Sequence, residues 1–265
     1  LIGACTGFIA GNSFGSPWAG VAAAVVAGAL LALIHAFLTV TLRANQVVSG
    51  LAVTLFGTGL SGYLGQDYVG QPAGAVFGKI AVPLLSDIPI IGSILFKQDA
   101  LVYISYFLVP LAAWYFYKTR SGLFLRAMGE NPAAVDAAGI DVFGLRYLYI
   151  VIGGALAGVA GAYLSLVYTP LWVEGMTAGR GWIALALVTF ATWRPARVVF
   201  GAYLFGGVTM LQFAFQGMGI AVPPQFMAMT PYLATILVLV LISRNPEWIR
   251  LNVPASLGKP FQPNH

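Results

Sequence analysis

Long apolar stretches separated by short polar connections dominate the chain. A helix needs about 20 apolar residues, within a range of roughly 17–25, to cross the hydrocarbon core of a bilayer. The stretches of this length are Trp18–Leu42, Ala44–Gly65, Leu101–Tyr117, Tyr147–Tyr168 and Val198–Phe215. The pattern therefore predicts a polytopic bundle of membrane-spanning helices.

Three further apolar segments extend this pattern. Phe226–Ser243 spans the membrane if its helix continues through Pro231, which a membrane helix tolerates. Leu1–Gly11 is interpreted as the end of another spanning helix that begins upstream, because the chain opens without Met and without the charged region of a signal peptide. Trp182–Trp193 is too short to cross alone and is predicted to be a half-helix or re-entrant segment. We expect an all-α transmembrane helix bundle of about seven or eight membrane segments.

The connections between these stretches carry most of the charge. Gln66–Asp99 is rich in Gly and Pro, and we expect it to form one or two short helices at the membrane interface. Residues 118–146 hold four of the thirteen Lys/Arg of the chain and three of its eight acids. We expect a transmembrane domain over 1–243, with 118–146 as a cytoplasmic loop, and a cytoplasmic tail over 244–265.

Charge asymmetry orients the predicted helices. If 118–146 is cytoplasmic and segments alternate, the outer face carries only Lys79, Lys97 and Arg180. The inner face then carries Arg43, Lys118, Arg120, Arg126, Arg146, Arg194, Arg197, Arg244, Arg250 and Lys259. This is a positive-inside bias. It requires Trp182–Trp193 to change sides.

Composition narrows the functional class. Hydrophobic residues make up 59% of the chain and charged residues 8%, whereas a soluble domain is roughly half apolar and a quarter charged. The basic residues are dispersed without a basic–aromatic patch, so membrane lipid is an expected partner and nucleic acid is not. Cys5 is the only cysteine, which excludes an intrachain disulfide and a cysteine-based metal site. We expect no metal.

Motifs for chemistry are scarce. No segment matches the phosphate-binding loop of ATPases, so the chain is expected to bind no ATP and no other cofactor itself. No pair of acids lies within a membrane segment, which disfavours a carboxylate proton relay. Gly11–Gly15 matches the G-x-S-x-G pattern of hydrolases, but we interpret it as a turn between two membrane helices. A hydrolase built on Ser13 and His35 is the alternative.

Several polar side chains lie in or beside apolar segments. Facing lipid is costly for them, so we expect them to point into the bundle. His35 is predicted either to make a hydrogen bond within the bundle or to line a pathway. Asn45 and Gln46 either cap a helix or contribute to the substrate pathway, and Gln212 has the same two interpretations as His35.

The segment from Glu174 to Trp182 places an acid, a base and three glycines before the short apolar segment. Broken helices at membrane depth form polar sites in transporters. Glu174, Arg180 and Trp182 are therefore candidates for the substrate pathway, with Trp182 stacking on a planar substrate. The alternatives are an ion pair between Glu174 and Arg180 that holds a loop, and an interfacial tryptophan.

Small residues define two further elements. Gly154, Gly158, Gly161 and Ser165 form a face that lets two helix backbones approach closely, either within the bundle or at a dimer interface. Within the charged loop, Asn131 and Pro132 are typical of a helix start and Gly139 of a helix end. The surface of this helix of about seven residues consists mostly of Ala133, Ala134, Ala137 and Ala138. A small, smooth, capped helix is suited to docking into a partner.

The sequence around this helix resembles a known family. The run Gly122–Pro132, GLFLRAMGENP, followed by Ala137–Ile140, resembles the cytoplasmic loop of ABC-importer permeases of the branched-chain amino acid and monosaccharide superfamily. Ala44–Leu51 and Glu174–Gly181 support the resemblance. Within the superfamily the chain is most similar to nucleoside (purine) uptake permeases that work with basic-membrane-protein lipoproteins. Such permeases carry a further N-terminal helix and a Gly- and Glu-containing segment upstream of the position of Leu1.

The resemblance implies a multi-pass permease subunit of an ATP-driven importer in a prokaryotic inner membrane. Its implied partners are a second homologous permease subunit, cytoplasmic ATPase subunits that use ATP–Mg, and an extracytoplasmic substrate-binding lipoprotein. The short helix would be the coupling helix that enters a cleft of the ATPase. The implied coupling residues are Gly129, Glu130, Asn131, Pro132, Ala133, Ala134, Asp136, Ala137, Ala138 and Gly139.

The same resemblance makes nucleosides the expected substrate class, moved inward by alternating access. Branched-chain amino acids and sugars are the alternatives within the family. An ion-coupled secondary transporter is the alternative of a different class. It would require acids or a cation site inside the helices.

Overall fold

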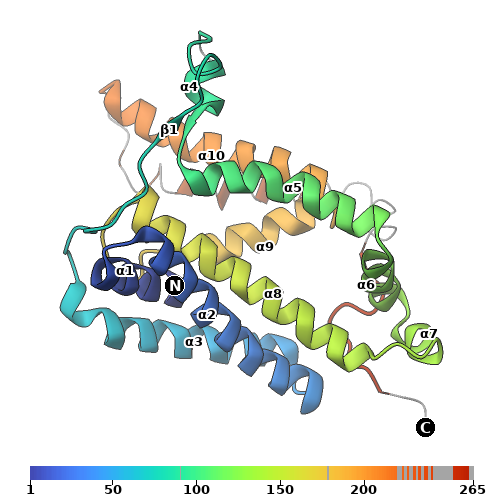
Figure 1. Cartoon of the computed structure of the whole chain (residues 1–265). Coiled ribbons are helices and arrows are strands. Elements are labelled where there is room, and N and C mark those ends of the chain that lie inside the picture. Colours follow the sequence, from blue (N-terminus) through green and yellow to red (C-terminus); the bar gives the residue numbers. More distant parts are fainter. Residues whose placement is uncertain are drawn as a thin grey trace. The chain divides into compact units, whose positions relative to one another are not determined.

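The computed structural model of the chain is mostly helical in the part that it describes (Figure 1). It describes residues 1–89, 91–177, 179–219, 223, 226, 229–230, 232–233, 236–237, 240 and 253–262. The α-helices are α1 (Ile2–Phe14), α2 (Pro17–Ala36), α3 (Gln46–Gly65), α4 (Ile91–Leu95), α5 (Ala100–Lys118), α6 (Arg120–Glu130), α7 (Pro132–Ala137), α8 (Val142–Tyr163), α9 (Arg180–Phe190) and α10 (Pro195–Gly217). The strands are β1 (Ile80–Ala81) and β2 (Lys97–Gln98).

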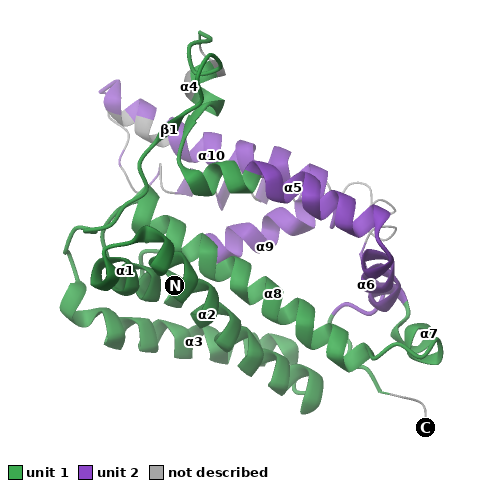
Figure 2. Cartoon of the chain, in the orientation of Figure 1, with its two compact units in different colours: residues 1–105, 131–178, 258–265 green, residues 106–130, 179–257 purple. Residues whose placement is uncertain are grey.

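The chain divides into two compact units, coloured separately in Figure 2. Unit 1 comprises Leu1–Ser105, Asn131–Ala178 and Gly258–His265. Unit 2 comprises Tyr106–Glu130 and Gly179–Leu257. Each unit is described by itself below.

Four helical stretches are long and apolar enough to cross a membrane: Pro17–Thr41, Gln46–Tyr68, Ala100–Lys118 and Val142–Tyr168. They confirm four of the predicted spans. The predicted span Val198–Phe215 lies within α10, which has 23 residues and includes the apolar stretch Pro195–Leu211. Most of Phe226–Ser243 falls outside the described residues.

Helix α8 extends beyond the predicted apolar span Tyr147–Tyr168 at its N-terminal end. The helix begins five residues earlier, at Val142. The side-chain oxygen of Asp141 accepts a hydrogen bond of 3.0 Å from the amide of Gly144 and so caps the new turn, as an aspartate at a helix N-cap does. Arg146, the last residue of the charged connection, is therefore helical.

Helices α1, α2 and α8 pack with their backbones in contact (Figure 1). A Cβ atom added to Gly28 would lie 2.2 Å from the carbonyl oxygen of Gly154, and one added to Gly158 would lie 2.1 Å from that of Ala24. Real side chains cannot approach so closely. The small-residue face of α8 is therefore filled by α2 within the same chain, which confirms bundle packing as the interpretation of these glycines.

Helix α1 completes this packing on the other edge of the glycine face. A Cβ atom at Gly161 would lie 2.7 Å from the amide nitrogen of Ala4, and the hydroxyl of Ser165 donates a hydrogen bond of 2.8 Å to the carbonyl of Ala4. The helix ends at Gly15, whose φ of 61° is left-handed. With 13 residues, α1 is about 20 Å long.

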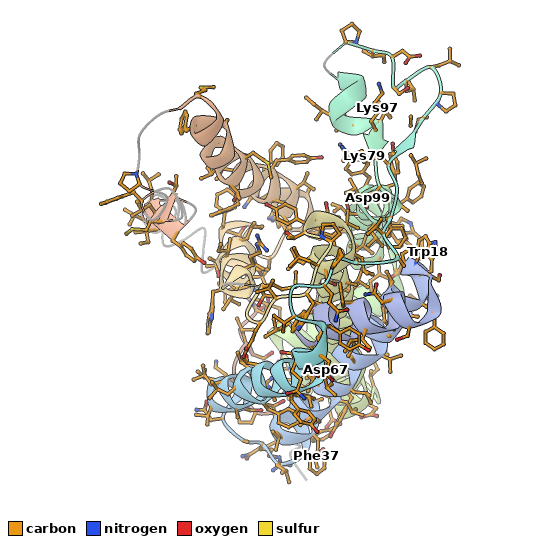
Figure 3. All side chains as sticks on the ribbon, turned by 90° about the vertical axis from the view of Figure 1, so that its left-hand side faces the viewer. Trp18, Phe37, Asp67, Lys79, Lys97 and Asp99 are labelled. Carbon is orange, nitrogen blue, oxygen red and sulfur yellow. The ribbon has the colours of Figure 1, made fainter. Side chains whose placement is uncertain are left out.

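The connection Gln66–Asp99 contains the short helices that were expected, a 3-10 turn over Gln66–Tyr68 and the α-helix α4. It also holds an antiparallel ribbon that was not expected, in which Ile80 pairs with Gln98. Figure 3 shows Lys79 and Lys97 on this ribbon and Asp99 at its base. Strands of two residues leave no alternating pattern to read, so the ribbon was not predictable from periodicity.

In unit 2, α9 is a short helix that packs on α10. It has 11 residues, about 16 Å of length, so the short segment is confirmed as too short to span alone. A Cβ atom at Gly201 of α10 would lie 3.0 Å from side-chain atoms of Leu187 and Phe190. The helix ends before the predicted Trp193, because Thr192 and Trp193 adopt positive φ values of 48° and 56°.

Candidate functional site

The helix predicted from Asn131, Pro132 and Gly139 is present as α7, with six residues. Its N-terminus is capped by the side-chain oxygen of Asn131, which accepts a hydrogen bond of 3.2 Å from the amide of Ala134. Its C-terminus ends in a Schellman motif. In that motif the amides of Gly139 and Ile140 donate to the carbonyls of Asp136 and Val135, at 2.8 and 3.3 Å. Gly139 has the required positive φ of 79°.

One side of α7 is anchored and the other is open. Val135 is only 4% exposed, so its side chain anchors the helix to the rest of unit 1. The exposed residues of the segment share short side chains or a carboxylate and are Glu130, Asn131, Ala133, Ala134, Ala137, Ala138 and Gly139. Gly129, Pro132 and Asp136 are half-buried. The helix therefore presents an alanine surface that a partner can approach closely.

Sequence reasoning missed the contacts that support this segment. Val135 was not singled out, although it is the one large apolar side chain among four alanines. The C-terminal segment 253–262 was read only as a tail, yet Ser256 bonds to the end of α6 and Phe261 is buried against α8. An aromatic residue in a polar tail was the available signal, although it does not indicate the residue that Phe261 contacts.

Asn45 caps the helix that begins at Gln46. The side-chain oxygen of Asn45 accepts hydrogen bonds of 2.9 and 3.2 Å from the amides of Val47 and Val48, at the start of α3. Asn45 is exposed and Gln46, the first residue of the helix, is half-buried. The capping interpretation of Asn45 is thus confirmed.

His35 is used within the bundle. Its Nδ1 lies 3.0 Å from the hydroxyl of Ser49, which joins α2 to α3. The interpretation of His35 as a bundle hydrogen bond is confirmed. Ser13 lies at the exposed end of α1, where Gly11–Phe14 form the last helical turn and only Gly15 lies in the turn toward α2. The hydrolase interpretation therefore lacks its nucleophile elbow, and the imidazole of His35 is paired with Ser49 and not with Ser13.

The remaining pathway candidates belong to different units. In unit 1, Glu174 is exposed and its carboxylate lies over Gly62 of α3, where an added Cβ atom would be 3.1 Å from Oε1. In unit 2, Arg180 begins α9 and Trp182 is 60% exposed. The ion pair between Glu174 and Arg180 stays a prediction. The side chain of Gln212 lies outside the described residues.

The loop that carries Glu174 is anchored by a second tryptophan. Trp172 is 1% exposed and packs among Ala4, Cys5 and Phe8. Its carbonyl accepts a hydrogen bond of 2.9 Å from the amide of Gly70. The loop is therefore fixed to the α1 side of the bundle.

Comparison with known proteins identifies relatives along nearly the whole chain. Residues 1–243 match the family model described as branched-chain amino acid transport system / permease component. A putative glucose ABC transporter permease of Haloferax volcanii is 40% identical over 97% of this chain and 84% of its own length. A nucleoside ABC transporter permease of Lactococcus lactis is 39% identical, covering 86% of this chain and 74% of its own length.

A guanosine ABC transporter permease of Bacillus subtilis is 33% identical, covering 90% of this chain and 79% of its own length. No solved structure matches the chain. The relatives therefore inform on the function of the chain.

Proposed function

Because the chain belongs to the family of branched-chain amino acid transport system permease components, and is thus the membrane-spanning permease subunit of an ABC transporter, we propose that it carries nucleosides into the cell. It is a multi-pass protein of the prokaryotic plasma membrane. The ATPase of such a system is a separate subunit, and a substrate-binding component works with the permease.

The substrate proposal is carried by two relatives from different bacteria. Their names specify a nucleoside and guanosine, at 39% and 33% identity over most of this chain. A sugar is the second candidate, because a relative at 40% identity is named as a putative glucose permease. A nucleoside contains a sugar ring, so the two substrate classes share hydroxyl groups, and a nucleoside adds a planar base.

A planar base would be recognised by stacking and a few hydrogen bonds. Trp182 presents an exposed indole at the first turn of α9, which supports a stacking role. Glu174, on its anchored loop, and Arg180 are proposed as polar groups of the pathway. Gln46, half-buried at the start of α3, and Gln212 remain candidates for the same role.

The function is tested by uptake into proteoliposomes that hold the full-length permease with its companion permease, ATPase and binding protein. We expect ATP-dependent uptake of radiolabelled uridine and adenosine that persists when ion gradients are collapsed. ATP-dependent uptake of glucose without uridine would favour the sugar candidate. Uptake of leucine alone would favour an amino acid. Transport that follows a proton gradient without the ATPase would overturn the ABC assignment of mechanism.

We further propose that α7 is the coupling helix. Its support is local: the helix is capped at both ends, anchored by Val135 and exposes alanines that permit close contact with a cleft. Glu130 and Asp136 would pair with basic residues of the ATPase. Closure of the two ATPase subunits on ATP–Mg would displace this helix and shift the permease pair between outward- and inward-facing states.

The assembly proposed is two permease subunits, two cytoplasmic ATPases and an extracytoplasmic binding lipoprotein. The second permease subunit is proposed to be a homologue of this chain. In this arrangement 118–146 and the C-terminal tail lie on the cytoplasmic side, together with most of the basic residues, as the positive-inside rule predicts.

A further inference from the structure

The C-terminal segment returns to the helix that precedes α7. The amide of Ser256 donates a hydrogen bond of 2.9 Å to the carbonyl of Gly129. The Ser256 hydroxyl lies 2.7 Å from the same carbonyl and 3.0 Å from that of Met128. Carbonyls in the last turn of a helix have no partner within the helix. Ser256 therefore caps the C-terminal end of α6, inside unit 2.

Packing reinforces this cap. A Cβ atom added to Gly129 would lie 3.2 Å from the Cβ atom of Pro254. The segment then turns, with the amide of Leu257 donating a hydrogen bond of 3.0 Å to the carbonyl of Pro254. Leu257 itself is exposed. The cap is therefore made by Ser256 and Pro254, while the apolar side chain beside them contributes little.

The same segment also contacts the helix that follows α7, inside unit 1. Phe261 is 5% exposed, and its ring centroid lies 5.6 Å from that of Phe143. The guanidinium carbon of Arg146 lies 5.9 Å from the Phe261 ring centroid, and Nη1 of Arg146 donates a hydrogen bond of 3.3 Å to the carbonyl of Lys259. Phe261 is thus a buried anchor in an otherwise exposed stretch.

These two contacts bracket α7 along the chain. Gly129 stands just before it, and Phe143 follows it in the first turn of α8. The chain passes from unit 2 to unit 1 between Glu130 and Asn131 and again between Leu257 and Gly258. The hydrogen bond between Ser256 and Gly129 therefore joins two segments of unit 2, each of which ends next to a point where the chain enters unit 1.

We propose that residues 253–262 form a tail clamp that positions α7 for coupling. A helix of six residues is far below the roughly 12–15 residues at which isolated helices become even marginally stable. Its position depends on the buried Val135 and on its two flanks, and the tail clamp holds both flanks. A displacement imposed on α7 by the ATPase is then transmitted to α6 and α8 instead of being absorbed by loose ends. This inference rests on the proposed coupling role of α7.

The test uses the assembled transporter in proteoliposomes and measures substrate uptake and ATP hydrolysis side by side. Phe261→Ala removes the anchor, and Ser256→Pro removes both the amide donor and the hydroxyl. We expect each variant to assemble and to hydrolyse ATP. The number of ATP molecules consumed per substrate transported should rise about fivefold or more, because a fivefold change corresponds to the lower end of typical coupling free energies. Leu257→Ala is the matched control, because its exposed side chain makes no comparable contact, and it should leave the ratio unchanged.

If the tail had only a structural role, the variants would lower the amount of assembled complex. The ratio of ATP hydrolysis to uptake in the complex that does assemble would then be unchanged, and this result would overturn the proposal. Phe261→Leu keeps an apolar anchor and should restore coupling. Ser256→Ala keeps the hydrogen bond of the amide and should have a smaller effect than Ser256→Pro.

A variant of α7 separates the two proposals. If Ala134→Trp abolishes uptake while the tail variants couple normally, the tail clamp proposal is wrong and the coupling-helix proposal stands. If Ala134→Trp also transports normally, the coupling proposal itself fails.

Discussion

The bundle of α1, α2 and α8 and the segment around α7 are held in opposite ways. In the bundle, glycines bring backbones together so closely that Gly28 and Gly158 leave no room for a single further carbon atom. Around α7, the structure depends on a few end caps and on two buried side chains, Val135 and Phe261. The bundle buries its small residues, while α7 exposes its alanines.

The difference follows from what each region contacts. Lipid tails are as apolar as the helices themselves, so close backbone packing replaces the hydrophobic effect as the force between membrane helices. A helix that docks into a partner must leave its small residues uncovered. Small residues therefore have two roles in this chain, close helix packing where they are buried and docking of a partner where they are exposed. Substitutions should accordingly affect folding in one region and coupling in the other.

The largest effect is expected in the bundle, from Gly158→Leu. The added side chain would begin 2.1 Å from the carbonyl oxygen of Ala24, so the helices must separate. Overpacking of a side-chain core costs about 1–3 kcal/mol and occasionally more, and here the obstacle is backbone, which cannot rotate away. We expect loss of folded protein, measured as the monodisperse fraction of a fluorescent fusion in detergent.

The matched control is Gly153→Leu in the same helix, where an added Cβ atom has no neighbour within 4 Å. It should give folded protein close to the wild-type amount. Equal yields of the two variants would contradict the close contact between α2 and α8, and with it the contrast between the two regions.

The second effect is loss of transport without loss of folding, from Ala134→Trp or Ala138→Trp. Both side chains are exposed on α7, so the folded chain can accommodate an indole. A cleft shaped for alanine cannot. We expect membrane insertion and folded yield to remain normal and ATP-dependent uptake to be abolished in the full-length transporter.

Ala134→Ser keeps the small volume and should transport normally. Wild-type uptake by the tryptophan variants would remove the docking role of α7 while leaving the bundle untouched. This pair of variants thus separates the exposed use of small residues from the buried one.

Local patterns in the sequence predicted much of this organisation. Spans of about 20 apolar residues were found where the helices are, and the cap residues Asn131 and Gly139 marked both ends of α7 correctly. The glycine face of α8 was predicted from its helical spacing, since residues three and four apart lie on one face. These features depend on residues close together in the chain.

Features that depend on distant residues were not predicted. The contact of Phe261 with Phe143 joins positions far apart in the sequence, and no local pattern indicates it. The apolar pattern marked the span from Tyr147, but it did not mark the earlier turn of α8 that the cap at Asp141 begins. The ribbon of β1 and β2 has strands too short to show a period.

The smallest effect is expected from Asn131→Ala, which tests whether caps alone hold the exposed region. Loss of an N-cap side chain typically costs about 1 kcal/mol, and the bond removed is the one that Asn131 accepts from the amide of Ala134. Global stability should not change, because α7 is a small local element, so the detergent melting temperature should match wild type. Uptake should fall by a factor of about five, because 1 kcal/mol changes the ratio of folded to unfolded α7 by about that factor.

Asn131→Asp is the control. It keeps an acceptor oxygen and adds a charge that a helix N-terminus favours, so it should retain uptake. If the aspartate variant loses as much uptake as the alanine variant, the side-chain amide of Asn131 contacts the ATPase directly. The position of α7 would then depend more on its partner than on its own N-cap.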